Sequence, residues 1–232
     1  MNGLSISPYA ISFLMSFVVS FAVVFVLLRK RGVPANYIGY SMFLNFILIL
    51  YGAKLFTVIT SGFTVTLWKA GISSLGGAIG LLLGIFIFGF MYKEGRRALW
   101  ESYITALPLL YAISKFGCYL VGCCHGIPYS GPFAVTYDGK YTQGGPYFPI
   151  QLVESLAFGC IFLVVFLLYM RDKRKYLIPT VMILCAVTKF SLEYLREEHI
   201  GKIISANQLV CSVFFIWGII TIYKKRRSIH VA

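Results

Sequence analysis

Charged side chains are scarce in this sequence, and their scarcity argues against an ordinary soluble protein. Only 12% of the 232 residues are charged, whereas 59% are hydrophobic. A soluble domain averages about 25% charged residues and about 45–50% apolar residues. We therefore expect an integral membrane protein.

Acidic residues are fewer still, with eight Asp and Glu against 21 Lys and Arg, which gives a formal net charge of +13. Such an excess can indicate a nucleic-acid partner. Here, however, the basic residues cluster in short runs between long apolar segments, as membrane topology requires. We therefore expect no nucleic-acid binding.

The long apolar segments predict the fold class. A bilayer core of about 30 Å needs roughly 20 apolar residues in a helix. They predict an all-α polytopic membrane protein, with a single transmembrane domain over residues 1–232 and seven transmembrane helices. The N-terminus lacks the basic region of a cleavable signal peptide, so we expect the first helix to be retained. The seven predicted spans are 8–28, 37–60, 73–92, 101–121, 149–170, 177–195 and 204–223.

Runs of basic residues follow every other predicted span and predict the orientation. They lie at residues 29–31, 93–97, 171–175 and 224–227. The positive-inside rule places these runs in the cytoplasm. We therefore expect the N-terminus outside, the C-terminus in the cytoplasm, and the long connection 122–148 outside.

Five charged residues fall within the predicted spans. A charge at the centre of a membrane helix costs about 2.5–3.5 kcal/mol on insertion scales, so such residues usually mark a site or a pathway. The alternative is that those near the outer end of a span extend to the interface. The five are Lys54, Lys115, Glu154, Lys189 and Glu193.

Three of the late charges share one stripe of a predicted helix. Lys189 and Glu193 are four residues apart and can pair on one face. Arg196 lies seven residues after Lys189, on the same stripe. These residues predict a polar cavity that opens toward the outer leaflet, where a phospholipid head group is the natural anion.

Small residues in the second and third spans predict close helix packing. Gly52 and Ala53, just before Lys54, allow another helix to approach. Four glycines lie within residues 71–80 and make a robust helix there unfavourable. They suit either a close backbone crossing or a broken helix that lines a cavity.

The stretch GCYLVGCCHGIP, residues 117–128, holds three cysteines and a histidine. A zinc site typically needs pairs of ligands that converge, and three ligands this close in sequence cannot easily surround one ion. We therefore expect no metal and no cofactor. A Cys118–Cys123 disulfide and a nucleophilic Cys123 or Cys124 stay open. The favoured interpretation is a helix break shaped by Gly117, Gly122, Gly126 and Pro128, with the cysteines as packing residues.

This stretch, together with FPIQLVE at 148–154, resembles the prolipoprotein diacylglyceryl transferase family. The resemblance covers nearly the whole chain in order, through PYA at 8–10, GAK at 52–54, ISSLGG at 72–77, KFSLEYLR at 189–196 and NQ at 207–208. It implies the same seven-span fold in a bacterial cytoplasmic membrane. It also implies transfer of diacylglyceryl from phosphatidylglycerol to the cysteine thiol of a lipobox-containing prolipoprotein, with a thioether and glycerol phosphate as products.

The chain departs from the family pattern at several positions. Lys54, Lys115 and Lys189 stand where the family has arginine, which keeps the charge but loses the bidentate fork. Leu75 stands where the family has a histidine, and Cys118 where it has an asparagine. We expect a diverged member that still handles an anionic phospholipid. The alternatives are a relative that binds phospholipid or lipoprotein without catalysis, and one that transfers the glyceryl group to another acceptor.

The implied reaction assigns roles to individual residues. The site must bind a phosphodiester, stabilise the leaving phosphate and deprotonate a thiol. The candidate catalytic residues are Lys115, Lys189, Glu193 as the group that orients Lys189, and His125 as a base in place of Leu75. The alternative for His125 is a turn residue that faces water. The candidate substrate-binding residues are Tyr9, Lys54, Cys118, Gly126, Gln151, Glu154 and Arg196.

Overall fold

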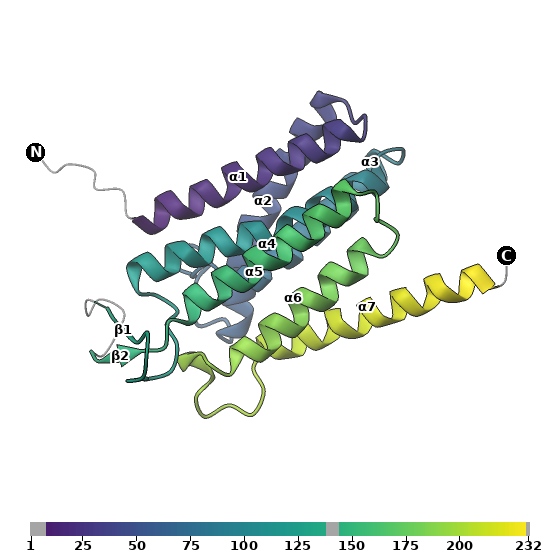
Figure 1. Cartoon of the computed structure of the whole chain (residues 1–232). Coiled ribbons are helices and arrows are strands. Elements are labelled where there is room, and N and C mark those ends of the chain that lie inside the picture. The colour runs from purple at the N-terminus through teal and green to yellow at the C-terminus, as the bar shows by residue number, and fades with distance from the viewer. Residues whose placement is uncertain (1–7, 138–143, 231–232) are drawn as a thin grey trace, which may run out of the picture. The chain divides into compact units, whose positions relative to one another are not determined.

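The computed structural model describes residues 8–137 and 144–230, with side chains to residue 227. Each of the seven predicted apolar segments forms a helix (Figure 1). The helices are α1 Pro8–Lys30, α2 Ala35–Thr60, α3 Ser74–Met91, α4 Arg96–Val121, α5 Ile150–Met170, α6 Leu177–Glu193 and α7 Ala206–His230.

Six of these helices are long and apolar enough to cross a membrane, and the exception is α6. This helix has 17 residues and contains both Lys189 and Glu193. The prediction of a polytopic helical membrane protein is therefore supported, with six spans that meet the criterion of length and composition.

Two helices, α4 and α7, extend at least five residues beyond the predicted spans. Helix α4 begins at Arg96, and its first turns are held by an ion pair between Arg97 and Glu101, with 2.7 Å between Nε and Oε1. Helix α7 continues through the basic run to His230. Apolar length marks the part of a helix that lies in the membrane, whereas lysine and arginine propagate a helix well beyond it. Positive charges also suit the C-terminal end of the helix dipole.

The chain forms two compact units, of which one comprises residues 21–107. In this unit α2 and α3 cross closely because both carry glycine at the contact. A Cβ atom on Gly52 would lie only 2.7 Å from the carbonyl oxygen of Gly76. Helix α3 runs unbroken from Ser74 to Met91, with Ser73 as its N-cap. The glycines thus serve a close crossing, and the alternative of a broken helix is wrong.

Polar contacts in the same unit hold connections in place. The Lys54 ammonium donates to the backbone carbonyls of Leu67 and Trp68, at 3.3 and 3.2 Å. The carboxylate of Glu101, which is 2% exposed, pairs with Arg31 at 2.9 Å as well as with Arg97. Lys54 therefore anchors the loop that precedes α3.

The other unit comprises the described parts of residues 1–20 and 108–232. Here α6 packs against both α5 and α7 (Figure 1). The connection between α4 and α5 forms a short antiparallel pair, β1 Val135–Thr136 with β2 Pro146–Tyr147. Strands of two residues are too short to show the alternation by which a strand is predicted. A 3-10 turn, Glu197–His199, follows α6.

Candidate active site

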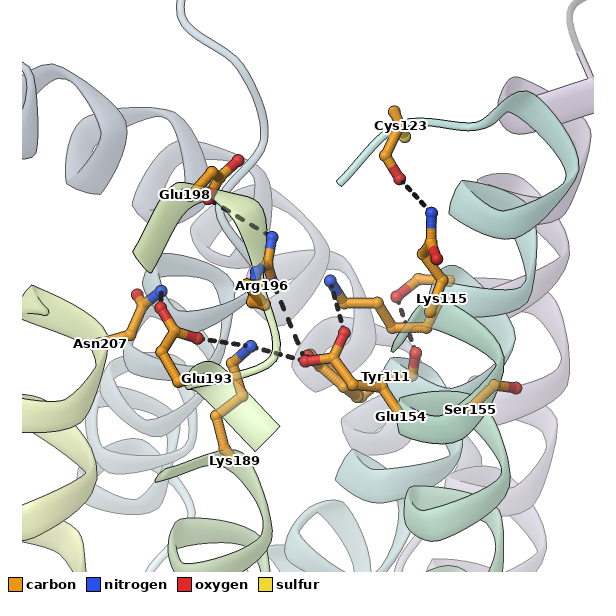
Figure 2. A network of polar contacts seen from close by, with 12 residues as sticks. Tyr111, Lys115, Cys123, Glu154, Ser155, Lys189, Glu193, Arg196, Glu198 and Asn207 are labelled. Atoms are coloured by element: carbon orange, nitrogen blue, oxygen red, sulfur yellow. Dashed lines mark hydrogen bonds and ion pairs between the residues drawn. The ribbon is translucent and has the colours of Figure 1, made fainter. Parts of the chain in front are cut away.

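Glu154, on α5, is fully buried and lies between two lysines from different helices (Figure 2). Lys115 on α4 places Nζ 3.0 Å from Oε2, and Lys189 on α6 places Nζ 2.7 Å from Oε1. The two lysines are only 4% and 6% exposed. The alternative that they extend to the membrane interface is therefore wrong, and both serve one buried site.

Tyr111 completes the surroundings of the Glu154 carboxylate. Its hydroxyl donates to Oε1 at 2.7 Å, and its ring lies 5.4 Å from Nζ of Lys115. The sequence-based prediction did not include Tyr111. It lies four residues before Lys115, on the same face of α4, and this spacing was the available signal.

Glu193 holds Lys189 from the other side, with 3.1 Å between Nζ and Oε2. The predicted pairing of these two residues along α6 is confirmed. The other oxygen of Glu193 accepts hydrogen bonds from Asn207 at 2.6 Å and from Ser205 at 3.1 Å. Helix α7 and the segment before it therefore fix Glu193, which in turn fixes Lys189.

Arg196 is the least satisfied cation of the group. It is 5% exposed, yet its Nη1 lies 3.8 Å from Glu154, and its Nη2 lies 3.4 Å from Glu198, a residue that is largely exposed. Within the described part of the chain, its buried Nε has no hydrogen-bond partner. Burial opposes the charge, but Glu154 and its other anionic neighbours more than offset burial and raise the pKa of Arg196.

The charges of this cluster do not balance. Three buried cations, Lys115, Lys189 and Arg196, face two buried carboxylates, Glu154 and Glu193. A buried charge is costly unless it is paired. The arrangement therefore favours the binding of an anion. A phosphodiester carries a single negative charge, which would balance the surplus positive charge.

The chain leaves α4 through a turn that the glycine pattern predicted. The amide of Cys123 donates to the carbonyl of Cys118 at 3.2 Å, and the amide of Gly122 donates to Tyr119 at 3.3 Å. With Gly122 at a φ of 70°, these bonds make a Schellman motif. A Cβ on Gly122 would also lie 2.7 Å from the ring of Tyr137. The helix break predicted here is confirmed at Gly122, whereas Gly117 lies within α4, where a Cβ would lie 2.5 Å from the side chain of Ser12.

Gly126 and Gln151 fasten the segment that follows the turn. The amide of Gly126 donates to the carbonyl of Phe148 at 3.2 Å. The backbone of Gly126 also forms an isolated antiparallel β-bridge with that of Arg196. The fully buried Gln151 donates through Nε2 to the carbonyl of Cys123 at 2.9 Å. Both residues thus have a structural role, and their predicted contact with substrate stays a prediction.

His125 is buried beneath this segment, with 7% of its surface exposed. Its Nδ1 lies 3.4 Å from Oε2 of Glu197 and 3.3 Å from the carbonyl oxygen of Gly126, and its ring packs on Tyr147. The alternative of a turn residue that faces water is therefore wrong. A carboxylate beside the imidazole suits the predicted base, whose role stays a prediction.

The three cysteines of the motif converge although they are close in sequence. Cys118 is buried, Cys123 and Cys124 are half-buried, and all three are free thiols with no disulfide among them. Their sulfur atoms lie within 4.8 Å of one another. Hydrogen bonds from Cys118 and Cys123 hold the pKa of the Cys124 thiol well below its usual value. Tyr9, on α1, lies close enough to interact electrostatically with all three.

Lys54 and Leu75, two positions at which the chain departs from the family pattern, belong to the unit of residues 21–107. Leu75 is buried on α3, where a leucine side chain offers no proton acceptor. The part of Lys54 in substrate binding stays a prediction.

The fold and the cluster around Glu154 define a polytopic helical membrane protein with a buried, positively charged site. Residues 1–224 match the prolipoprotein diacylglyceryl transferase family, and the chain belongs to that family. The resemblance predicted from the motifs is thereby confirmed.

Individual relatives are similar at low identity. The chain is 26% identical over 217 residues to the phosphatidylglycerol–prolipoprotein diacylglyceryl transferase of Chlamydia pneumoniae, an alignment that covers 82% of this chain and 74% of that protein. It is 27% identical to the enzyme of the same name from Tolumonas auensis, over 66% of this chain and 62% of that protein. It is 23% identical to the enzyme of the same name from Finegoldia magna, over 98% of this chain and 94% of that protein.

Proposed function

We propose that this protein transfers diacylglyceryl from phosphatidylglycerol to the cysteine thiol of a lipobox-containing prolipoprotein, as a multi-pass protein of a bacterial cytoplasmic membrane. Membership of the family and the names of the bacterial relatives support this function. The chemistry is attack of the thiol sulfur on the glyceryl carbon next to the phosphate. The carbon–oxygen bond breaks, and glycerol phosphate leaves with the electron pair.

The single observation that carries the proposal is the surplus of buried positive charge around Glu154. Lys115 and Lys189 flank its carboxylate, and Arg196 keeps a buried donor without a hydrogen-bond partner within the described part of the chain. Preorganised cations of this kind bind a phosphodiester and stabilise the charge that develops on the leaving phosphate. We assign Arg196 and the two lysines to this role.

The remaining assignments follow from position. Glu193 orients Lys189 through the contact described above, and Tyr111 holds Glu154. His125, with Glu197 beside it, is the residue to which we assign removal of the proton from the acceptor thiol. Tyr9 interacts with the cysteines of the turn after α4, and Cys118 is one of them. We assign both residues to binding of the acceptor peptide.

The proposed topology has seven spans. Helix α6 counts as the seventh because its 17 residues reach the lower end of the length of a spanning helix, about 17–25 residues, and its buried charges pair within the protein. Basic runs lie at the C-terminal ends of α1 and α7 and directly after α3 and α5, which supports an N-terminus outside and a C-terminus in the cytoplasm.

The direct test incubates purified protein with phosphatidylglycerol and a synthetic lipobox peptide, followed by mass analysis. We expect the peptide to gain one diacylglyceryl group. A peptide with serine in place of the cysteine, and vesicles of phosphatidylcholine, serve as controls and should give no product. Phosphatidylglycerol binding without a mass change would instead support a lipid-binding protein without this activity.

A further inference from the structure

We propose that Cys118, Cys123 and Cys124 bind a thiophilic metal ion of the Zn²⁺ class, and that the ion keeps a fourth position open for the thiol of the acceptor. The metal site concerns this chain alone, whereas the role of the open position rests on the function proposed above.

The geometry of the three sulfur atoms fits such an ion. They lie within 4.8 Å of one another and all three thiols are free. Zinc binds thiolate sulfur at about 2.3 Å, so three sulfur ligands around one zinc ion lie about 4 Å apart. A small closure of side chains would therefore complete the set without movement of the helices.

The backbone explains how ligands so close in sequence can converge. The Schellman motif folds Cys123 back over the last turns of α4, where Cys118 lies. Cys124 then adopts a φ of 57°, a left-handed conformation that residues other than glycine seldom adopt. Gln151 fixes the carbonyl of Cys123 at 2.9 Å. Ligands with this spacing point apart in a regular helix or an extended strand, and this turn is neither.

The surrounding charges suit a metal held by three thiolates. A divalent ion with three thiolate ligands carries a net charge of −1. Lys115 lies one helical turn before Cys118, and both Lys115 and Arg196 interact electrostatically with Cys124. The complex would therefore lie beside the cationic cluster, whose positive charges would stabilise it electrostatically.

The described residues offer three ligands, which would leave the fourth position of a tetrahedral ion open. His125 follows Cys124 in the chain, but its Nδ1 faces Glu197 and the carbonyl of Gly126. Among the described residues the group that could hold an ion consists of the three cysteines. Three protein ligands with an open position are the arrangement of catalytic zinc, whereas structural sites are closed.

The open position would activate the acceptor. A thiol that coordinates zinc is held as the thiolate, so binding to the ion would lower the pKa of the acceptor and ease transfer of its proton to His125, the base proposed above. The bound sulfur would then form its bond to the glyceryl carbon as the carbon–oxygen bond breaks, and the neutral thioether would leave the ion. This chemistry would supply the activation that Leu75, in place of a histidine, cannot.

The test uses the full-length protein purified without chelators, with metal content measured by mass spectrometry and Co²⁺ substituted for Zn²⁺. We expect about one zinc per chain and a sulfur-to-cobalt charge-transfer absorption. Both should be lost in Cys118→Ser and in Cys123→Ser. Cys160→Ser, which alters an exposed cysteine on α5, should keep both.

Addition of the lipobox peptide should shift the cobalt spectrum, whereas the serine peptide should leave it unchanged. Wild-type protein that neither holds nor takes up Zn²⁺ or Co²⁺, an oxidised cysteine pair in the purified protein, or full transfer activity in Cys118→Ser would overturn the inference and leave the proposed function standing. Zinc bound through the cysteines without any transfer would instead overturn the proposed function and keep the metal site.

Discussion

Glu154 holds three cations together, so its charge is the one that the site can least lose. Lys115, Lys189 and Arg196 reach it from three different segments, and Tyr111 adds a hydrogen bond. In a buried cluster, removal of one partner leaves the others uncompensated, which costs more than the pair itself contributes. We therefore expect Glu154 to contribute to the stability of the protein as well as to the proposed function.

Glu154→Gln should lower the free energy of unfolding by about 3–5 kcal/mol, because it leaves buried lysines without a counter-charge. Thermal unfolding in detergent measures the change. Glu198→Gln is the matched control, since Glu198 also contacts Arg196 but is largely exposed, and it should shift stability by no more than about 0.5 kcal/mol. Equal unfolding temperatures for the two variants would contradict the claim that Glu154 compensates the charge of the buried cations.

The sequence allowed part of this site to be predicted. Charges within apolar segments identified Lys115, Glu154, Lys189 and Glu193, because an isolated charge in a membrane span needs a partner. Spacing on a single helix then predicted the contact between Lys189 and Glu193. Spacing says nothing about contacts between helices, so the meeting of α4, α5 and α6 at Glu154, and the part of Tyr111, emerged only from the fold.

At the scale of elements, the end of α4 decides where the cysteine motif lies. Gly122 permits the left-handed turn, and the segment that follows joins the start of α5 and the end of α6. The amide of Ile127 donates to the carbonyl of Leu195 at 3.0 Å, and the amide of Phe148 donates to Ile127 at 3.0 Å. One short segment thus connects three helix ends beside the charged cluster.

Gly122→Ala should destabilise the protein by about 1–2 kcal/mol, because a Cβ is unfavourable at a φ of 70° and would meet the ring of Tyr137. The midpoint of thermal unfolding measures the cost. Gly159→Ala is the control, since a Cβ there meets nothing within 4 Å in the middle of α5. It should leave stability unchanged or raise it by up to about 1 kcal/mol. If the Gly122→Ala protein were as stable as the Gly159→Ala protein, the left-handed turn at Gly122 would be contradicted.

Elements were more predictable than their ends. Apolar length located all seven helices, and the glycine and proline pattern located the turn after α4. The extension of α7 through the basic run and the two-residue strands were missed, because neither leaves a signal in apolar length or alternation. The convergence of the cysteines was missed because it depends on the left-handed Cys124.

At the scale of the whole molecule, the basic runs support the proposed topology and the buried cations support the proposed preference for an anionic lipid. Phosphatidylglycerol should raise the unfolding temperature more than phosphatidylcholine does, since a ligand that binds only the folded state stabilises it by mass action. The difference should shrink in Arg196→Gln. It should persist in Lys202→Gln, which removes an exposed charge from the same connection. Equal unfolding temperatures in the two lipids would count against an anion site.

The measurement that tests the central claim most directly is the rate of diacylglyceryl transfer to a lipobox peptide, compared among wild type, Arg196→Gln and Lys202→Gln at matched folded fractions. We predict a peptide heavier by one diacylglyceryl group with wild type and with Lys202→Gln. We predict a rate about 10²-fold lower with Arg196→Gln, as expected when one donor to the developing charge is removed. A folded wild-type protein that leaves the peptide unmodified, or an Arg196→Gln variant as fast as wild type, would contradict the account.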